Sequence, residues 1–303
     1  MSDQIEIHHV KKSISPSLMV LIFGKSYTSS DCVSGGTADA HGSGPCTRKG
    51  VWGFKSPLAH VKNNNPNRTP KIYAHRGASH DFPEHTLAAY MAGIEQGADG
   101  FECDLRLTKD SVPVLWHDAT MERTAGCSGT IASLTYEEIY DRYPQVMRLD
   151  EFLDLALLHK KDLALETKHP VPTSREIEAV LAKELISRQS EILTSGIEIS
   201  VMSFSWLAIE NVRRSMPDIN TVMLLGSLRA KKRRRFTSAQ TIGPDIAMLK
   251  TKPLFIDEAK KDGKRLFVWT VDEAHDVVFC AQKGVDVVIT NKPSQARKVL
   301  GYP

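Results

Sequence analysis

Two carboxylates separated by one residue, Glu102 and Asp104, stand at the end of an apolar run at residues 99–105. Side chains alternate between the two faces of a strand, so both carboxylates point one way and Cys103 points the other way. Carboxylates held close together repel unless protons or a cation lie between them, and a hard divalent cation is the usual solution. The alternative is a solvated strand end.

A third carboxylate, Glu166, closes another apolar run at 162–168 and shares a strand face with Lys168. Glu166 could complete a site in which three carboxylates hold a cation, and Lys168 would meet an anionic substrate. Alternatively, the two side chains only neutralise each other along the strand.

Two histidines, His75 and His117, follow the short apolar runs 71–74 and 112–116. Imidazole titrates near neutrality, which suits a general acid and a general base for displacement at phosphorus. A lone histidine at a strand end is more often a core or surface residue with its hydrogen bonds satisfied. Two histidines that converge on three carboxylates and on Arg76 favour phosphodiester chemistry instead.

The position of His117 depends on a hairpin. Too few residues separate the runs 99–105 and 112–116 for a parallel crossover, so the second run returns antiparallel through a turn at 109–111. A hairpin centred near residue 110 brings His117 level with Cys103, and so beside Glu102 and Asp104. Ser111 takes the place of a common turn glycine, so a positive φ there would carry a small cost.

The elements that must position these residues alternate between short apolar runs and amphipathic stretches, which is typical of an α/β fold. We expect eight parallel strands, at 71–75, 99–105, 162–168, 198–204, 220–225, 245–249, 265–271 and 285–290. We expect helices at 85–97, 148–160, 173–186, 205–216, 253–263, 272–284 and 293–300, with Gly97 as a stop signal and Thr173 and Glu176 as a capping box. The pattern predicts a (β/α)8 barrel with a small hairpin insertion after the second strand, and its site at the carboxyl ends of the strands.

Residues 1–69 differ from the rest, because they are rich in Gly, Ser, Asn and Pro without sustained periodicity. We expect a poorly ordered N-terminal extension there and a barrel domain at 70–303. The apolar stretch 18–23 is too short to span a membrane, and no small-residue cleavage motif follows it. We therefore expect a cytoplasmic protein without stable membrane insertion, with export through an atypical signal as the alternative.

Charge and cysteine content exclude several function classes. The net charge is +3, from 39 basic and 36 acidic residues, so no global field favours nucleic acid as a partner. The basic run 231–235 lacks interleaved aromatics and is interpreted as a solvated loop or helix face. The five cysteines are odd in number and widely spaced, which argues for reduced thiols and against a disulfide framework or a structural zinc site: Cys32, Cys46, Cys103, Cys127 and Cys280.

Taken in order, the motifs resemble those of bacterial glycerophosphodiester phosphodiesterases. The resemblance covers residues 71–293 and rests on ordered motifs of approximately the family's spacing. They are HRG at 75–77, P-E-x-T at 83–86, E-x-D at 102–104, HD at 117–118 with RT at 123–124, E-x-K at 166–168, SF at 203–204, VWTVD at 268–272 and VITNKP at 288–293.

The resemblance implies a (β/α)8 TIM barrel related to phosphatidylinositol-specific phospholipase C, with one divalent cation, Ca²⁺ or Mg²⁺. It implies an enzyme that splits a small-molecule glycerophosphodiester into an alcohol and sn-glycerol 3-phosphate, with the glycerol 2-hydroxyl as internal nucleophile. The implied roles are metal ligation by Glu102, Asp104 and Glu166, base and acid chemistry by His75 and His117, and substrate binding by Arg76, Lys168 and Trp269. For Trp269, a place in the barrel core is an equal alternative.

One position departs from the family pattern, because His85 stands where the family usually has Asn. An imidazole can still donate a hydrogen bond, so we expect activity to be retained. Two other functions stay open at this point. One is a phospholipase C-like or D-like hydrolase of an intact lipid, and the other is a catalytically silent barrel that binds phosphorylated ligands.

Overall fold

The computed structural model describes residues 69–226 and 236–302, and within them eight parallel strands form a closed barrel. The barrel closes where β1 pairs directly with β2. The strands are β1 (Lys71–His75), β2 (Gly100–Leu107), β4 (Asp162–Thr167), β5 (Ile199–Ser203), β6 (Asn220–Leu225), β7 (Thr241–Pro244), β8 (Arg265–Val268) and β9 (Val287–Thr290). The predicted (β/α)8 barrel is confirmed.

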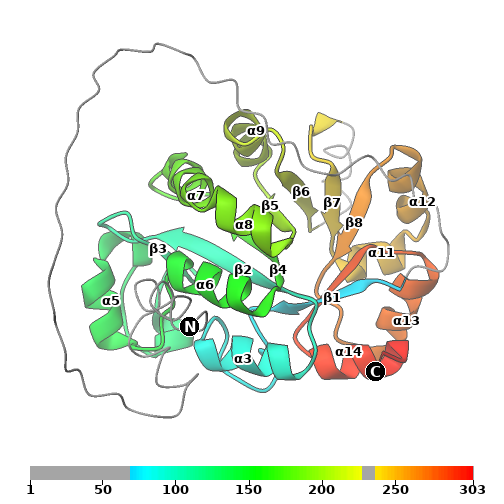
Figure 1. Ribbon diagram of the computed structural model, residues 1–303, viewed down its shortest axis with the longest axis horizontal. Helices are drawn as coiled ribbons and strands as arrows, with labels where there is room; N and C mark the ends of the chain where they lie inside the picture. Colours follow the sequence, from blue (N-terminus) through cyan, green and yellow to red (C-terminus); the bar gives the residue numbers. More distant parts are fainter. Residues whose placement is uncertain (1–68, 227–235, 303) are drawn as a thin grey trace, which may run out of the picture. The chain divides into compact units, whose positions relative to one another are not determined.

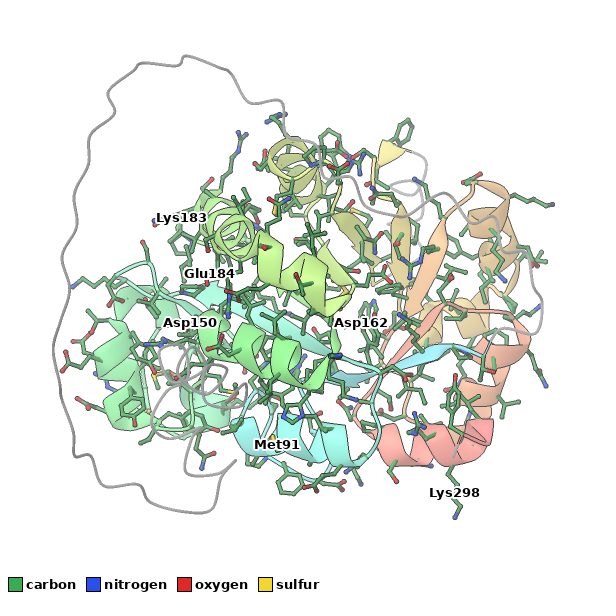
Figure 2. All side chains as sticks on the ribbon, viewed as in Figure 1. Met91, Asp150, Asp162, Lys183, Glu184 and Lys298 are labelled. Atoms are coloured by element: carbon green, nitrogen blue, oxygen red, sulfur yellow. The ribbon has the colours of Figure 1, made fainter. Side chains whose placement is uncertain are left out.

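Helices lie outside the strands (Figure 1) and connect them. In the described ranges they are α3 (Leu87–Glu95), α4 (Glu122–Ala125), the 3-10 helix η1 (Ile131–Ser133), α5 (Tyr136–Arg142), α6 (Leu149–His159), α7 (Glu176–Ser187), α8 (Gln189–Ser195), α9 (Trp206–Ser215), α11 (Ile246–Thr251), α12 (Leu254–Lys261), α13 (Ala274–Gln282) and α14 (Pro293–Leu300). Lys183 of α7 and Lys298 of α14, labelled in Figure 2, are exposed on the outside of the barrel.

The predicted hairpin after the second strand is confirmed. β3 (Pro113–Leu115) pairs antiparallel with β2, with Leu105 opposite Leu115. The turn contains Ser111 with a φ of 60°, the strained value that the sequence suggested. The amide of Trp116 donates to the carbonyl of Asp104 at 2.9 Å, which brings the next residue, His117, to the end of β2.

Two local predictions are wrong. The run 245–249 is not a strand, because the Asp245 side chain accepts from the amides of Ala247 and Met248 and so caps the start of α11. The sixth barrel strand is instead the preceding β7, Thr241–Pro244, which contains a glycine and a proline and so lacks a strand-like composition. The capping box at Thr173 does not form either, because α7 begins at Glu176 after Arg175, which makes no side-chain cap.

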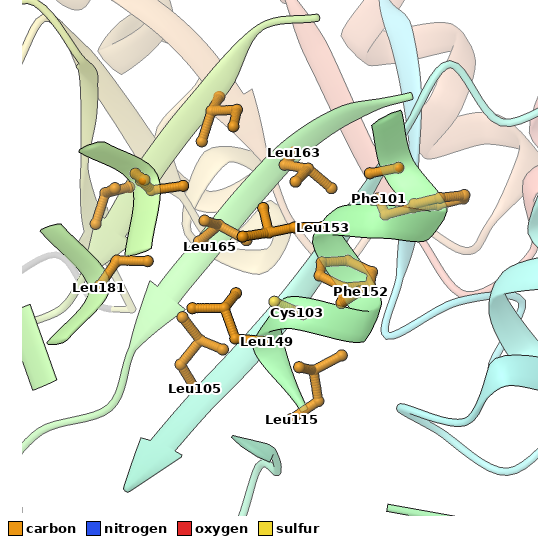
Figure 3. Packing of buried hydrophobic residues seen from close by; sticks show 14 of the residues in the cluster. Phe101, Cys103, Leu105, Leu115, Leu149, Phe152, Leu153, Leu163, Leu165 and Leu181 are labelled. Carbon is orange, nitrogen blue, oxygen red and sulfur yellow. The ribbon is translucent and has the colours of Figure 1, made fainter. Parts of the chain in front are cut away.

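Packing between α6 and the outer face of β2 and β4 fixes which way the site residues point. Leu149, Phe152 and Leu153 of α6 lie against Cys103 of β2 and Leu165 of β4, all fully buried (Figure 3). Burying each large apolar side chain contributes about 1.5–3 kcal/mol. A slip of one residue would turn Cys103 inward and its carboxylate neighbours outward, so this packing holds the site residues in the barrel.

The opposite end of the barrel is closed by hydrogen bonds around Asp162, at the start of β4 (Figure 2). Its carboxylate accepts from the Tyr73 hydroxyl at 3.0 Å and from the Glu198 amide at 2.8 Å, and it pairs with Lys71. Hydrogen bonds at this end of the barrel contribute to stability, whereas the chemistry of such a barrel takes place at the carboxyl ends of the strands.

Several predictions concern residues outside the described ones: most of the extension 1–69 with its apolar stretch 18–23, the basic run 231–235, and Cys32 and Cys46. The cysteines that are described are free thiols, at positions 103, 127 and 280. None of the helices in the described part of the chain combines the length and apolar content that a membrane-spanning helix needs.

Candidate active site

A cavity of about 150 Å³ opens at the carboxyl ends of the barrel strands, and its wall has two different halves. One half is charged and carries His75, Arg76, Glu102, His117, Glu166 and Lys168. The other half comes from β5, β6, β9 and the residues after β8, and carries Met202, Phe204, Leu224, Trp269, Thr270 and Ile289.

The three predicted carboxylates are brought together by strand register. Asp104 of β2 pairs with Glu166 of β4, and Glu102 of β2 pairs with His75 of β1. One oxygen from each of Glu102, Asp104 and Glu166 lies within 4.8 Å of the others, and all three side chains are buried. The alternative of a solvated strand end is therefore wrong.

Two cations lie against this cluster. Lys168 Nζ is 2.7 Å from Asp104 Oδ1 and 2.8 Å from Glu166 Oε1, and Arg76 Nε is 3.0 Å from Asp104 Oδ2. Lys168 thus neutralises Glu166, as one alternative held, but it bridges to Asp104 as well. Five charged groups share one partly enclosed space, so each carboxyl responds differently to its neighbours.

Asp104 is the carboxylate that stays ionised. Burial alone would raise the pKa of Asp104, but Lys168, a hydrogen bond from His85 and the charge of Arg76 lower it well below its ordinary value. Burial and then the Asp104 charge raise the pKa of Glu102 well above its ordinary value, and they raise the pKa of Glu166 to about 7. Glu102 and Glu166 therefore hold a proton more readily than an ordinary glutamate does.

The cluster fits a hard divalent cation. All three donors are carboxylate oxygens, the ligand type that Ca²⁺ and Mg²⁺ prefer, and they converge within the reach of one ion. Raised proton affinity at Glu102 and Glu166 means that a cation could take the place of the protons there. Three buried carboxylates could thus hold a metal ion at this point of the barrel.

His75 ends β1 with its ring against the cluster. Its Nε2 is 3.8 Å from Glu102 Oε2, and its Nδ1 is 2.7 Å from Asn291 Oδ1, just after β9. Burial, followed by the charge of Arg76, lowers the pKa of His75 to about 4, so the ring is neutral.

Arg76 and Gly77 follow His75 in a sharp turn, with φ values of 58° and 84°. The turn lets α3 approach closely: a Cβ at Gly77 would lie 2.6 Å from the backbone of Ala89, and the Ala78 amide donates to the Ala89 carbonyl at 2.8 Å. Glycine is required here by the close approach as well as by φ.

His117 reaches the cavity from the loop after β3. Its Nδ1 is 2.7 Å from Asp118 Oδ1, and its carbonyl accepts from Arg106 Nη2 at 2.7 Å and Nε at 3.0 Å. Burial lowers the pKa of His117, with Lys168 and Arg76 acting in the same direction and Asp104 and Asp118 against them. The loop is tied down further by Arg123, which pairs with Asp118.

Trp269 lies at the apolar half of the wall. Its Nε1 donates to the Gly243 carbonyl at 2.8 Å, and its ring packs edge to face on Phe204 with centroids 5.4 Å apart. The indole is partly exposed and lines the cavity, and it also packs against the buried core inside the barrel, so both places that the sequence left open apply to it.

All eight predicted site residues lie at this one mouth. The sequence did not identify the partners that hold them: Asn291 on His75, Asp118 on His117, and Glu84, which binds Arg76 at 3.2 Å and Arg123 at 2.6 Å. Asn291, Asp118 and Glu84 each lie inside one of the family motifs, and their place in a motif was the only sign in the sequence that they belong to the site. His85, noted only as a departure, donates to Asp104.

Comparisons with known proteins agree with this arrangement. Residues 75–295 match the model of the glycerophosphoryl diester phosphodiesterase family. A Mycobacterium tuberculosis protein named "Probable glycerophosphodiester phosphodiesterase 1" is 33% identical over 254 residues, which cover 76% of this chain and 92% of the relative. A glycerophosphodiester phosphodiesterase of Caldanaerobacter subterraneus is 29% identical over 73% of this chain and 94% of its own length.

Among solved structures, an Oleispira antarctica phosphodiesterase in complex with the product sn-glycerol-3-phosphate has the same fold. It superposes with a TM-score of 0.64 at 19% identity, covering 77% of this chain and 97% of that one.

Proposed function

Because this chain belongs to the glycerophosphoryl diester phosphodiesterase family, we propose that its cavity hydrolyses glycerophosphodiesters to an alcohol and sn-glycerol 3-phosphate with the help of one divalent cation. The observation that carries the proposal is the convergence of three carboxylates, two cationic side chains and two histidines on one cavity. The product-bound relative supports a small-molecule substrate of this kind.

Glu102, Asp104 and Glu166 would hold the cation, either Ca²⁺ or Mg²⁺. The bound ion would supply positive charge for the phosphoryl oxygens as the negative charge on them grows.

Lys168 and Arg76 orient the phosphate. Both cations already lie within 3.0 Å of Asp104, so an anionic substrate meets donors that are held in place rather than mobile surface side chains. Arg76 offers a planar fork to two phosphate oxygens, and Lys168 offers a point charge.

His75 acts as the base and His117 as the acid. His75 takes the proton of the glycerol 2-hydroxyl, whose oxygen attacks phosphorus, and His117 gives a proton to the departing alcohol oxygen. Water then opens the cyclic phosphate with the two proton transfers reversed. A hydroxyl of the substrate itself supplies an effective molarity that free water lacks.

The apolar half of the wall holds the carbon skeleton of the substrate. Trp269 and Phe204 present an edge-to-face pair of rings to the cavity, opposite the charged half. A diester entering between the halves therefore has its phosphate and its carbon chain placed on different sides.

The proposal is tested by measuring sn-glycerol 3-phosphate release from glycerophosphocholine and glycerophosphoethanolamine with Ca²⁺, with Mg²⁺ and with excess chelator. We expect release that depends on the metal. Release that continues undiminished in chelator would contradict the metal role. No release with either metal would contradict the substrate class and favour an intact lipid or a silent barrel.

A further inference from the structure

Two motif residues outside the carboxylate cluster, Asp272 and Asn291, form a series of hydrogen bonds that ends on His75. The Asp272 carboxylate, after β8, accepts at Oδ1 from Thr290 Oγ1 at 2.9 Å and from the Asn291 amide at 2.8 Å. Its Oδ2 accepts from Asn291 Nδ2 at 2.6 Å. Asn291 in turn places its Oδ1 2.7 Å from His75 Nδ1.

Donors and acceptors in this series of hydrogen bonds can be assigned in only one consistent way. A carboxylate accepts hydrogen bonds and donates none, so Asn291 must turn its NH₂ group toward Asp272. Its Oδ1 then faces His75, and an amide oxygen also only accepts, so His75 Nδ1 must carry the proton. The Ser79 hydroxyl lies 2.7 Å from the same Oδ1 and also 2.7 Å from the His75 carbonyl, so its single proton has two possible acceptors and the direction is set by Asp272.

A neutral imidazole has one N–H, so a proton on Nδ1 leaves Nε2 bare. His75 Nε2 faces the cavity, with Glu102 Oε2 at 3.8 Å, beyond hydrogen-bond distance. The bare nitrogen is therefore the one that meets a substrate hydroxyl. With the opposite tautomer, the ring would offer that hydroxyl a donor and could not take its proton.

We infer that Asp272 and Asn291 are positioning residues that keep the proton of His75 on Nδ1 and so make Nε2 the base. The inference deepens the proposed function and rests on it for its kinetic part, while the tautomer itself can be measured without any turnover. It assigns a role in orienting His75 to one residue of each of two motifs, VWTVD and VITNKP, that lie outside the proposed metal and phosphate sites.

The Asp272→Asn variant tests the inference directly, because it should reverse the direction of the hydrogen bonds. In this variant the side-chain oxygen at position 272 should still accept from Thr290 and from the backbone amide of Asn291, as Oδ1 does now. The new NH₂ group then takes the place of Oδ2. Two NH₂ groups cannot pair, so the Asn291 side chain must flip and present its NH₂ to His75 Nδ1. That forces the His75 proton onto Nε2. The double exchange D272N/N291D restores the original direction, because a carboxylate at 291 can only accept.

The first measurement is the ¹⁵N spectrum of the histidine-labelled full chain with Mg²⁺, at about pH 8, above the ordinary histidine pKa of about 6.5. A protonated ring nitrogen and a bare one resonate far apart, and a His75→Gln variant identifies the signals of His75. We expect Nδ1–H in the wild type, Nε2–H in D272N, and Nδ1–H again in D272N/N291D.

Two control variants change neighbours without reversing the chain. Thr290→Val removes one donor to Asp272, and Ser79→Ala removes one donor to Asn291, but both leave the Asn291 orientation in place. Both should keep Nδ1–H, so that only D272N moves the proton. A move of the proton in all three variants would mean that any disturbance of the cluster, not the direction of its hydrogen bonds, sets the tautomer, and would contradict the inference. In kinetics, D272N should lower kcat about 10²–10⁴-fold with KM changed only a few-fold, the scale of a lost general base.

A wild-type His75 with its proton on Nε2 would overturn the inference, and so would D272N with Nδ1–H and a wild-type kcat. If D272N fails to fold, the wild-type spectrum alone decides. Wild-type protein with Nδ1–H that releases no sn-glycerol 3-phosphate would refute the proposed function and leave the positioning of the proton supported.

Discussion

His85 and Asp104 are joined by a hydrogen bond of 2.9 Å between Nε2 and Oδ2, and the other ring nitrogen of His85 lies 3.0 Å from the Tyr90 hydroxyl. His85 is 4% exposed and has a φ of 61°, a value that His and Asn adopt more readily than most residues. Asp104 belongs to the carboxylate cluster, so His85 fixes the orientation of a proposed metal ligand.

Replacing His85 should therefore weaken cation binding. We expect His85→Ala to lower the affinity for Ca²⁺ or Mg²⁺ about 10–100-fold, the usual effect of losing a partner of a metal ligand. His85→Asn should lose less, because its amide can donate to Asp104 and tolerates positive φ. Calorimetric titration measures both, with the exposed His80→Ala as control. Wild-type affinity in His85→Ala would contradict the prediction.

Replacing Glu102 by Gln should abolish activity and leave the fold intact. Burial and the Asp104 charge penalise ionised Glu102, so the metal-free variant should melt at a temperature equal to or higher than the metal-free wild type. Added Ca²⁺ or Mg²⁺ should raise the melting temperature of the wild type and not of the variant. Glu95→Gln, an exposed change on α3, is the control. Wild-type turnover in Glu102→Gln would remove Glu102 from the metal site.

Replacing His117 by Ala should lower the rate about 10²-fold or more, the usual scale for a positioned acid or base. The side chain is 35% exposed, so the melting temperature should change little. The variant should also lose one limb of the pH–rate profile, since a titrating group has been removed. His275→Ala, on a histidine that is 70% exposed, serves as the control. A profile that keeps both limbs would argue against a proton-transfer role.

Glu84 should stabilise the protein in a pH-dependent way. Burial alone would raise the pKa of Glu84, but the Arg123 hydrogen bond and the Arg76 charge lower it to about 2. The folded pKa is below the unfolded value of about 4.5, so this stabilisation is present above about pH 4.5 and is lost as the pH falls toward 2. Because Arg123 is half exposed, we expect about 1–3 kcal/mol.

Urea unfolding of wild type and Glu84→Gln at several pH values measures this term. The difference in unfolding free energy between wild type and Glu84→Gln should be largest at pH 7 and should decrease as the pH falls to about 2–3. The exposed Glu95→Gln, on α3, serves as the control and should change the free energy of unfolding little. A Glu84→Gln difference that stays constant with pH would mean that packing, not charge, is lost.

The sequence predicted those parts of the site that follow from strand geometry. Glu102 and Asp104 had to share a face because of the two-residue period, and the number of residues between β2 and β3 required the hairpin that delivers His117. Both results depend only on short-range rules of the chain, and both are confirmed.

The rest depends on long-range contacts that local patterns do not contain. Asn291 meets His75 across 216 positions, and Arg123 meets Glu84 across 39. The strand misplaced at 245–249 has a similar cause: its apolar residues fit a strand or a helix equally well, and the cap made by Asp245 selects the helix. The composition of Thr241–Pro244 suggests no strand, and it pairs because β6 and β8 lie on either side.

The division of the cavity wall has a consequence for how such an enzyme can change. In the proposed function, proton transfer and phosphate binding fall to residues of β1, β2, β4 and the loop after β3, whereas Met202, Phe204 and Leu224 stand on β5, β6 and the segment just after β5. Mutations in this second sector alter the space offered to the departing alcohol and leave the reacting groups untouched. Under the proposed function, substitutions in this second sector can therefore change which diesters fit without replacing a group that transfers a proton or binds the phosphate.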